Sequence, residues 1–231
     1  GAHTAEQVWI GPFYPLAALL LVAAVNEALA FRFQEREARF VREAFASYLS
    51  PVLLSELSRH PERLQLGGEQ RDVSVMFADV RNFTRLSEAT DSQELVQLLN
   101  ELFTPMTSII QSHRGFVDKY IGDAIMAIWG APLDDPHHPQ RAASAALSMI
   151  NALDGLNASL RARGHPPVDM GGGLNSGPAV VGNMGATDRF NYTAIGDAVN
   201  LASRLEGLNR TYGTHILVSE YTRSGLGQGF L

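Results

Sequence analysis

The sequence predicts an α+β fold for the part of the chain that begins at residue 67. Short runs of β-prone apolar residues at 73–78, 116–129 and 215–219 indicate strands, and the second run contains a turn that makes it a hairpin. Longer stretches between these runs repeat their apolar residues at helical spacing. Strands joined in part by hairpins and interleaved with helices are typical of an α+β domain.

The composition restricts the function before any motif is considered. Of the 231 residues, 45% are apolar, which suffices for a core, and the formal net charge of −6 gives no basic footprint for nucleic acid. The chain has no cysteine, which excludes disulfides, thiolate metal sites and cysteine nucleophiles. Any metal ion must therefore be bound by Asp, Glu, His or backbone oxygen, a donor set that favours Mg²⁺ or Mn²⁺.

An uncharged run over residues 7–26 predicts a transmembrane segment, with its short flanks, at 1–34. Aromatic residues at the start of this run and arginines after its end favour a span whose following residues face the cytoplasm. Pro12 and Pro15 interrupt the first half, so a buried or amphipathic helix is the alternative. We accordingly expect anchoring in the inner or plasma membrane, with the following domain on the cytoplasmic side.

Residues 35–66 are predicted to form a helical stalk between this segment and the domain at 67–231. Apolar residues share one face of a charged helix that ends near Leu49, and a short second helix is expected at 52–59. The stalk could transmit a signal or serve as a plain linker. Its apolar repeat is too short to predict a coiled coil.

Asp79 stands at the end of the first strand, directly before a short helix that opens over 80–84. A carboxylate at this place can bind a divalent cation. The free N–H groups of Asn82, Phe83 and Thr84 at the helix start can bind phosphate. The simpler alternative is that Asp79 only caps the helix.

The hairpin at 116–129 places Lys119 and Asp123 on either side of its turn. Its second strand is apolar enough to be buried, although the carboxylate of Asp123 directly precedes it. For an isolated Gly-Asp turn, a solvated aspartate and a surface lysine are the simpler interpretation. His137 and His138, in the loop that follows, have no partner at metal-ligand spacing and are predicted to be solvated.

Further elements are predicted on both sides of residue 165. One long helix is capped by Asp91, and another spans 140–160. Strands at 170–175 and 179–183 suggest a second hairpin, because Ser-Gly-Pro at 176–178 has the chemistry of a turn. The three consecutive glycines at 171–173 lack the spacing and the lysine of a P-loop, and we interpret them as a place where another backbone approaches closely.

A last helix begins near Asp197, which is predicted to cap it. Asn200 and Arg204 lie four residues apart on this helix and therefore project from the same face. Taken alone, such a pair is usually part of a solvated surface.

Together these residues resemble the class III nucleotidyl cyclases, from about residue 71 to the end of the chain. The resemblance implies a ferredoxin-like βαββαβ sheet with helices on one face. The stalk also looks like the membrane-proximal connector of the family, as in a bacterial membrane-anchored adenylate cyclase. The motifs occur in family order: Phe-Ala-Asp-Val-Arg-Asn-Phe-Thr at 77–84, Lys-Tyr-Ile-Gly-Asp at 119–123, and Tyr-Thr at 192–193 followed by Asn200 and Arg204.

The resemblance implies a role for each of these residues. Asp79 and Asp123, helped by the carbonyl of Val80, would bind two Mg²⁺ or Mn²⁺ ions. Arg204 would stabilise charge on the α-phosphoryl group, and Asn200 would position the ribose. The implied reaction is attack of the ribose 3′-oxygen on the α-phosphorus, with release of pyrophosphate.

Lys119 and Thr193 occupy the positions at which the family selects its purine. A lysine donor and a threonine acceptor suit adenine, so the resemblance implies that the substrate is ATP and the product is 3′,5′-cyclic AMP. It also implies a homodimer with shared sites. The metal aspartates of such a site come from one subunit, and the base, ribose and transition-state residues come from the other.

Two departures from the family accompany this resemblance. Some relatives have an arginine at the position of Pro178, and the family continues past the strand at 215–219 with a further hairpin. We therefore expect the domain at 67–231 to be truncated at that hairpin. The alternatives are a catalytically silent dimerising regulatory domain of the same fold, a guanylate-specific cyclase, and a diguanylate cyclase, although the Gly-Gly-(Asp/Glu)-Glu-Phe hairpin of the last is missing.

Overall fold

The computed structural model of the protein describes residues 19–23, 26–27 and 66–230. The predicted transmembrane segment and stalk, at 1–34 and 35–66, lie almost entirely outside the described residues. Residues 19–23 and 26–27 are helical. No helix within the described ranges is both long and apolar enough to cross a membrane. The membrane span and the stalk therefore stay predictions.

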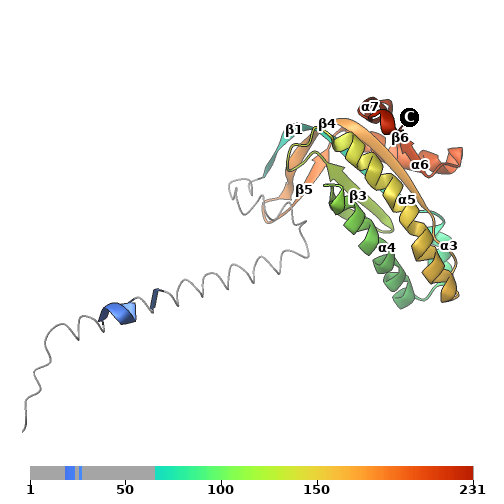
Figure 1. Cartoon of the computed structure of the whole chain (residues 1–231), viewed down its shortest axis with the longest axis horizontal. Coiled ribbons are helices and arrows are strands. Elements are labelled where there is room, and N and C mark those ends of the chain that lie inside the picture. The colour runs from blue at the N-terminus through green and yellow to red at the C-terminus, as the bar shows by residue number, and fades with distance from the viewer. Residues whose placement is uncertain (1–18, 24–25, 28–65, 231) are drawn as a thin grey trace, which may run out of the picture. The chain divides into compact units, whose positions relative to one another are not determined.

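From residue 67 onward, strands and helices alternate much as the sequence predicts (Figure 1). The elements are β1 (Gly67–Val80), α3 (Phe83–Ala89), α4 (Ser92–Ser112), β2 (Phe116–Ile121), β3 (Ala124–Trp129), α5 (His138–Ala162), β4 (Met170–Ala186), β5 (Arg189–Ile195), α6 (Asp197–Tyr212), β6 (Ile216–Val218), α7 (Glu220–Ser224) and the 3₁₀ turn η2 (Gln228–Phe230).

The strands form one sheet with neighbours in the order β2-β3-β1-β4-β5. β1 lies at its centre and runs antiparallel to β3 on one side and to β4 on the other. The short strand β6 pairs in parallel with the first part of β4. The order of the first four strands is that of a ferredoxin-like βαββαβ unit, and the predicted α+β fold is confirmed.

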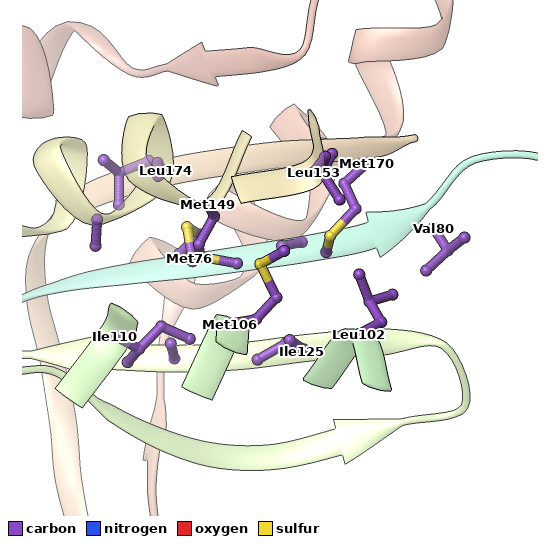
Figure 2. Close-up of a cluster of buried hydrophobic side chains, with 14 of the residues drawn as sticks. Met76, Val80, Leu102, Met106, Ile110, Ile125, Met149, Leu153, Met170 and Leu174 are labelled. Atoms are coloured by element: carbon purple, nitrogen blue, oxygen red, sulfur yellow. The ribbon is translucent and has the colours of Figure 1, made fainter. Parts of the chain in front are cut away.

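Helices α4 and α5 cover one face of the sheet and lie side by side (Figure 1). On α4, Leu98, Leu102, Met106 and Ile110 are buried at intervals of four residues, which places them in one stripe toward the strands. Figure 2 shows this stripe meeting side chains from β1, β3, β4 and α5 in one apolar cluster. This cluster is the main core of the domain.

Helix α6 lies on the opposite face, directly against β4. A Cβ atom on Gly173 would lie 2.1 Å from the backbone nitrogen of Glu206 and 2.3 Å from the carbonyl oxygen of Ala202. The next residue, Leu174, belongs to the core on the α4 and α5 side. The glycine run therefore marks a close backbone approach, as predicted. The expectation that helices cover one face only is wrong, because α6 covers the other.

Strand β4 is continuous from residue 170 to 186, so the predicted hairpin at this place is wrong. Its pairing with β1 passes without interruption through Pro178, which lies opposite Asp72. On its other edge, β4 pairs with β6 as far as Leu174 and with β5 only from Val180 onward. Between these two pairings, this edge of β4 has no described strand beside it. The turn-forming residues Ser176, Gly177 and Pro178 therefore interrupt no strand-to-strand hydrogen bonds on this edge.

The capping predictions have mixed outcomes. Asp91 accepts a hydrogen bond from the Gln93 N–H at 3.0 Å and is confirmed as the cap of α4. Gly196, and not the predicted Asp197, is the N-cap residue of α6, and Asp197 is the first helical residue. Its charge still lies in the first turn, where it is favourable to the helix dipole.

Candidate active site

The two predicted metal ligands are brought together at one end of the sheet. Asp79 is the penultimate residue of β1, and Asp123 lies in the turn that joins β2 to β3. Since β1 and β3 pair directly, with Ala78 opposite Ile125, the end of β1 lies beside that turn. The two carboxyl groups lie close enough to interact through their charges and, when one of them is protonated, through a hydrogen bond.

Crowding of carboxylates defines the electrostatics of this pair. Burial, followed by the hydrogen bond and the charge of Asp79, raises the pKa of Asp123 to about 6. Burial and the charge of Asp79 also raise the pKa of Glu206, which reaches the site from α6. Oδ1 of Asp79 is buried without a hydrogen-bond partner among the described residues. The site therefore concentrates negative charge, which the charges of Arg210 and Arg81 offset only in part at Glu206.

The donor set fits a hard divalent cation. Two carboxylates provide oxygen ligands only, and Mg²⁺ usually takes one or two carboxylates together with water and substrate phosphates. No cluster of three or more His, Asp or Glu side chains with metal-binding geometry occurs in the described part of the chain. Val80, whose carbonyl was expected to help, is the buried last residue of β1.

The predicted phosphate-binding N–H groups lie at the start of α3. Asn82 precedes the helix with a left-handed backbone (φ 58°), and its side chain makes no capping bond. Its carbonyl accepts from Leu86 N–H at 3.2 Å, which closes the first turn. The N–H groups of Phe83 and Thr84 therefore point out of the helix start, as in every helix. They follow Asp79 by four and five residues.

The predicted base-reading pair forms a second centre. Lys119 Nζ donates to Thr193 Oγ1 at 3.2 Å. Lys119 lies on β2 and Thr193 on β5, which are opposite edges of the sheet. The rings of Phe116 and Tyr192 also approach within 5.9 Å between centroids. The sheet therefore curls until its two edges meet at this pair.

Asp118 is a member of this centre that the sequence did not reveal. Thr193 Oγ1 donates a short hydrogen bond to Asp118 Oδ2, and Lys119 Nζ lies 3.5 Å from the same oxygen. The register of β2 against β3 shifts between Val117 and Lys119, which marks Asp118 as a bulge. The sequence gives only a weak indication of this role, because Asp118 differs from other aspartates of the chain only in its position next to Lys119.

Asn200 and Arg204 lie on the exposed side of α6. Arg204 is 66% exposed and pairs with Asp197 at 3.7 Å. Glu206, two residues later, is the α6 residue that reaches Asp79. Because successive helical residues are about 100° apart, Arg204 projects nearly opposite to Glu206. One chain thus brings the two predicted metal ligands together, but it points Arg204 away from them.

A supporting network behind the metal ligands was also missed. Arg81 Nη1 donates to Asp169 Oδ2 at 3.1 Å, and its Nη2 donates to the carbonyl of Thr214. His215 Nε2 lies 3.0 Å from the other oxygen of Asp169. The charge of Arg81 also lowers the pKa of Glu206, against the burial that raises it. The network fixes the chain directly after Asp79. Its sequence signal is the arginine within the 77–84 motif.

A second polar cluster contains a serine, a histidine and an aspartate, as the active site of a hydrolase does, but its serine is not accessible to a substrate. Ser74 Oγ lies 2.8 Å from His138 Nδ1, and His138 Nε2 lies 3.9 Å from Asp72. Ser74 is 0% exposed and also bonds Ser176 at 2.6 Å, so no substrate can reach it. His138 is 7% exposed and burial lowers its pKa, which corrects the prediction that it is solvated.

Comparison with known sequences accounts for this arrangement. The family described as the adenylate and guanylate cyclase catalytic domain matches residues 68–230. "Adenylate cyclase 1" of Rhizobium meliloti is 40% identical over 150 residues, which are 65% of this chain and 23% of that protein. The chain thus spans less than a quarter of the length of this relative.

Solved structures of cyclases share this fold, and they include both guanylyl and adenylyl cyclases. A crystal structure of the guanylyl cyclase Cya2 superposes with a TM-score of 0.66 at 34% identity, over 71% of this chain and 82% of that one. The adenylyl cyclase CyaB from P. aeruginosa gives 0.64 at 35% identity, over 69% and 82%. Overall similarity therefore does not separate the two purines.

Proposed function

The chain belongs to the class III adenylate and guanylate cyclase family, and on that premise we propose that it is an adenylate cyclase. It converts ATP into 3′,5′-cyclic AMP and pyrophosphate. The ribose 3′-oxygen forms a bond to the α-phosphorus, the bond to the β-phosphate oxygen breaks, and the hydroxyl proton is released.

The hydrogen bond between Lys119 and Thr193 is the observation that carries the choice of ATP. A lysine ammonium only donates, and adenine N1 only accepts. A threonine hydroxyl can accept from the N6 amino group of adenine. Guanine presents the opposite pattern, a carbonyl oxygen and a protonated ring nitrogen. The two side chains are 3.2 Å apart across the edges of the sheet, so one purine edge can meet both.

The remaining residues position the triphosphate and stabilise charge. Two Mg²⁺ or Mn²⁺ ions bound by Asp79 and Asp123 would neutralise phosphate charge and lower the pKa of the 3′-hydroxyl. The N–H groups at residues 82–84 bind phosphate oxygens. Arg204 binds the α-phosphoryl oxygens, for which the guanidinium fork is suited. Asn200 holds the ribose. Placement and electrostatics supply most of the rate.

The active unit we propose is a homodimer with two shared sites. Support comes from the direction of the side chains: Arg204 points away from Asp79 on its own chain, and it is exposed. A second chain related by a two-fold axis can bring its Arg204, Asn200, Lys119 and Thr193 to the metal ligands of the first.

We further propose that the protein is anchored in the inner or plasma membrane by the segment at 1–34, with the cyclase domain in the cytoplasm. The uncharged run at 7–26 and the arginines after it support this orientation. Protease treatment of sealed vesicles tests it. In vesicles whose cytoplasmic side faces inward, we expect the protease to cleave the cyclase domain only after the vesicles are opened. Equal cleavage of both ends of the chain in closed vesicles would contradict this orientation.

Product formation from ATP or GTP, with Mn²⁺ present, tests the activity. Wild-type protein should form cyclic AMP and little cyclic GMP. Asp123→Asn should lower kcat/KM for ATP at least ~100-fold, because one of two metal ligands is weakened. Asp154→Asn, an exposed aspartate on α5, is the matched control and should behave as wild type. Formation of cyclic GMP alone would support the guanylate alternative, and no product from either nucleotide would support a silent domain.

Mixing two inactive variants tests the shared site. Asp123→Asn chains lack a metal ligand, and Arg204→Ala chains lack the phosphate-binding arginine. An equal mixture should regain about a quarter of wild-type activity, because half of the dimers are mixed and each contains one intact site. Each variant measured alone should stay inactive. Absence of recovery, with dimers present by sedimentation, would exclude the shared site.

A further inference from the structure

We propose that Asp118 is the residue that makes the Thr193 hydroxyl an acceptor toward the purine, and that it thereby selects ATP over GTP. The inference rests on the proposed function and adds a residue to it. Asp118 itself does not touch the nucleotide in this proposal. It acts through Thr193 and Lys119 as a positioning residue.

The bulge in β2 is what places this carboxylate. In a regular strand, Asp118 would point to the face opposite to that of Lys119, its neighbour in sequence. The register shift between Val117 and Lys119 removes this alternation locally. As a result, both side chains reach Thr193, and the carboxylate of Asp118 is 0% exposed while the lysine is 39% exposed. The carboxylate lies behind the pair and the ammonium lies in front.

The hydroxyl of Thr193 has one proton and two lone pairs. It donates the proton to Asp118 Oδ2 and accepts from Lys119 Nζ at 3.2 Å. An ionised carboxylate only accepts, so it holds the hydroxyl proton on the side away from the nucleotide. What Thr193 can offer to a purine is therefore a lone pair.

That lone pair discriminates between the two bases. Adenine N6 carries hydrogens and can donate to it. Guanine O6 carries lone pairs, so the two oxygens would repel and the carbonyl would lose the partner it has in water. Without Asp118, the hydroxyl could rotate and donate to guanine O6, and the discrimination would fall. A threonine whose hydroxyl can rotate does not discriminate between the bases, because it can accept from adenine N6 or donate to guanine O6.

Two further observations fit a functional carboxylate. Burial raises the pKa of Asp118, while the Thr193 hydrogen bond and the Lys119 charge favour its ionised form. Its second oxygen, Oδ1, is buried and has no hydrogen-bond partner among the described residues. Burying a carboxylate oxygen without a partner costs free energy of folding, and such groups are concentrated at functional sites.

The ratio of kcat/KM for ATP to that for GTP tests the proposal. Asp118→Ala should lower this ratio about 10-fold or more, the range expected when one discriminating hydrogen bond is lost. In a Thr193→Val background, where no hydroxyl remains to orient, Asp118→Ala should leave the ratio unchanged. A ratio that stays at the wild-type value in Asp118→Ala, or a fall of equal size for both nucleotides, overturns the proposal.

Two additions keep the test decisive. Asp118→Asn is nearly isosteric and decides the question if Asp118→Ala does not fold; its amide can donate to Thr193 and free the hydroxyl proton, so the ratio should fall in the same direction. Asp135→Asn is the matched control, since Asp135 is a mostly buried aspartate paired with Arg141 at 2.7 Å, away from the purine pair. It should lose stability without a change in the ratio.

The outcome is separable from that of the proposed function. If the wild type forms no cyclic AMP, the proposed function fails. The proposal on Asp118 is then tested by the dissociation constants of ATP and GTP analogues that cannot cyclise. Their ratio should change in Asp118→Ala as described for kcat/KM, and an unchanged ratio overturns the role of Asp118. If the wild type forms cyclic AMP and the variants keep its preference, only the role of Asp118 fails.

Discussion

The two faces of the sheet are built in different ways. On the face covered by α4 and α5, apolar side chains fill the space between helix and strand (Figure 2). On the face covered by α6, glycine removes the side chain, and backbone lies against backbone at Gly173. Polar groups gather at the edge of this second face, where Asp79, Asp123 and Glu206 meet. The first face supplies stability, and the second supplies a position for charged residues.

Gly173→Ala should have the largest effect, because it separates α6 from the sheet. The new Cβ would lie 2.1 Å from a backbone nitrogen, and backbone cannot move aside as a flexible side chain can. We expect a loss of at least ~3 kcal/mol in the free energy of unfolding, together with loss of activity. Urea denaturation and cyclic AMP formation measure the two. A variant with wild-type stability would show that α6 does not lie so close.

Leu102→Ala should be nearly as costly for stability but should spare activity. Leu102 is fully buried in the α4 stripe, so its truncation leaves a cavity and costs about 3 kcal/mol. This face contributes only the carbonyl of Val80 and the N–H of Phe83 to the proposed site, and both are backbone groups. We therefore expect kcat/KM of the folded fraction to stay near the wild-type value. Activity measured below the melting temperature checks this. A selective loss of kcat would mean that the two faces are coupled.

Asp123→Asn should stabilise the metal-free protein at neutral pH. The pKa of Asp123 is raised to about 6, so the folded state binds the proton more tightly than the unfolded chain does. Its contribution therefore favours folding at low pH and is lost as the pH rises through 6. The variant does not lose this stability, and its gain in the free energy of unfolding is at most ~1 kcal/mol, because Asp123 is partly exposed and solvent screens its charge.

Thermal unfolding with a chelator measures this difference, which should disappear near pH 4. Added Mn²⁺ should then stabilise the wild type more than Asp123→Asn. Equal stabilisation of both proteins would mean that the cation binds elsewhere.

Gly172→Ala should have the smallest effect and the opposite sign to Gly173→Ala. Gly172 faces the α5 side and borders a small apolar gap lined by Met76, Met149 and other core residues. The nearest atoms to a new Cβ lie 3.8 Å away or more, which is ordinary contact. A gain of ~0.5 kcal/mol is expected from the reduced freedom of the unfolded chain. Chemical denaturation of the two alanine variants in parallel gives the comparison directly.

What the sequence could predict follows the same division. Apolar residues at intervals of four identify α4, and the run at 124–129 identifies β3, because a packed face requires them. Asp79 and Asp123 could be proposed as partners from their motifs. The continuity of β4 could not be predicted, since Ser176-Gly177-Pro178 has turn chemistry and only the unpaired edge beside it makes a straight strand possible. Asp118 was missed because its partner, Thr193, lies 75 residues away and is reached only when the sheet curls.

The unbroken strand β4 has a consequence for regulation. Gly171 lies opposite Asp79, and Gly182 lies opposite Thr193, so one strand runs from the proposed metal ligands to the proposed purine pair. At ~3.3 Å per residue, its path between these points is about 36 Å, and strands resist stretching. The distance between the proposed metal ligands and the proposed purine pair of one chain is thus fixed. A signal that turns shared sites on or off would have to rotate or shift one subunit against the other, with each domain moving as a rigid body.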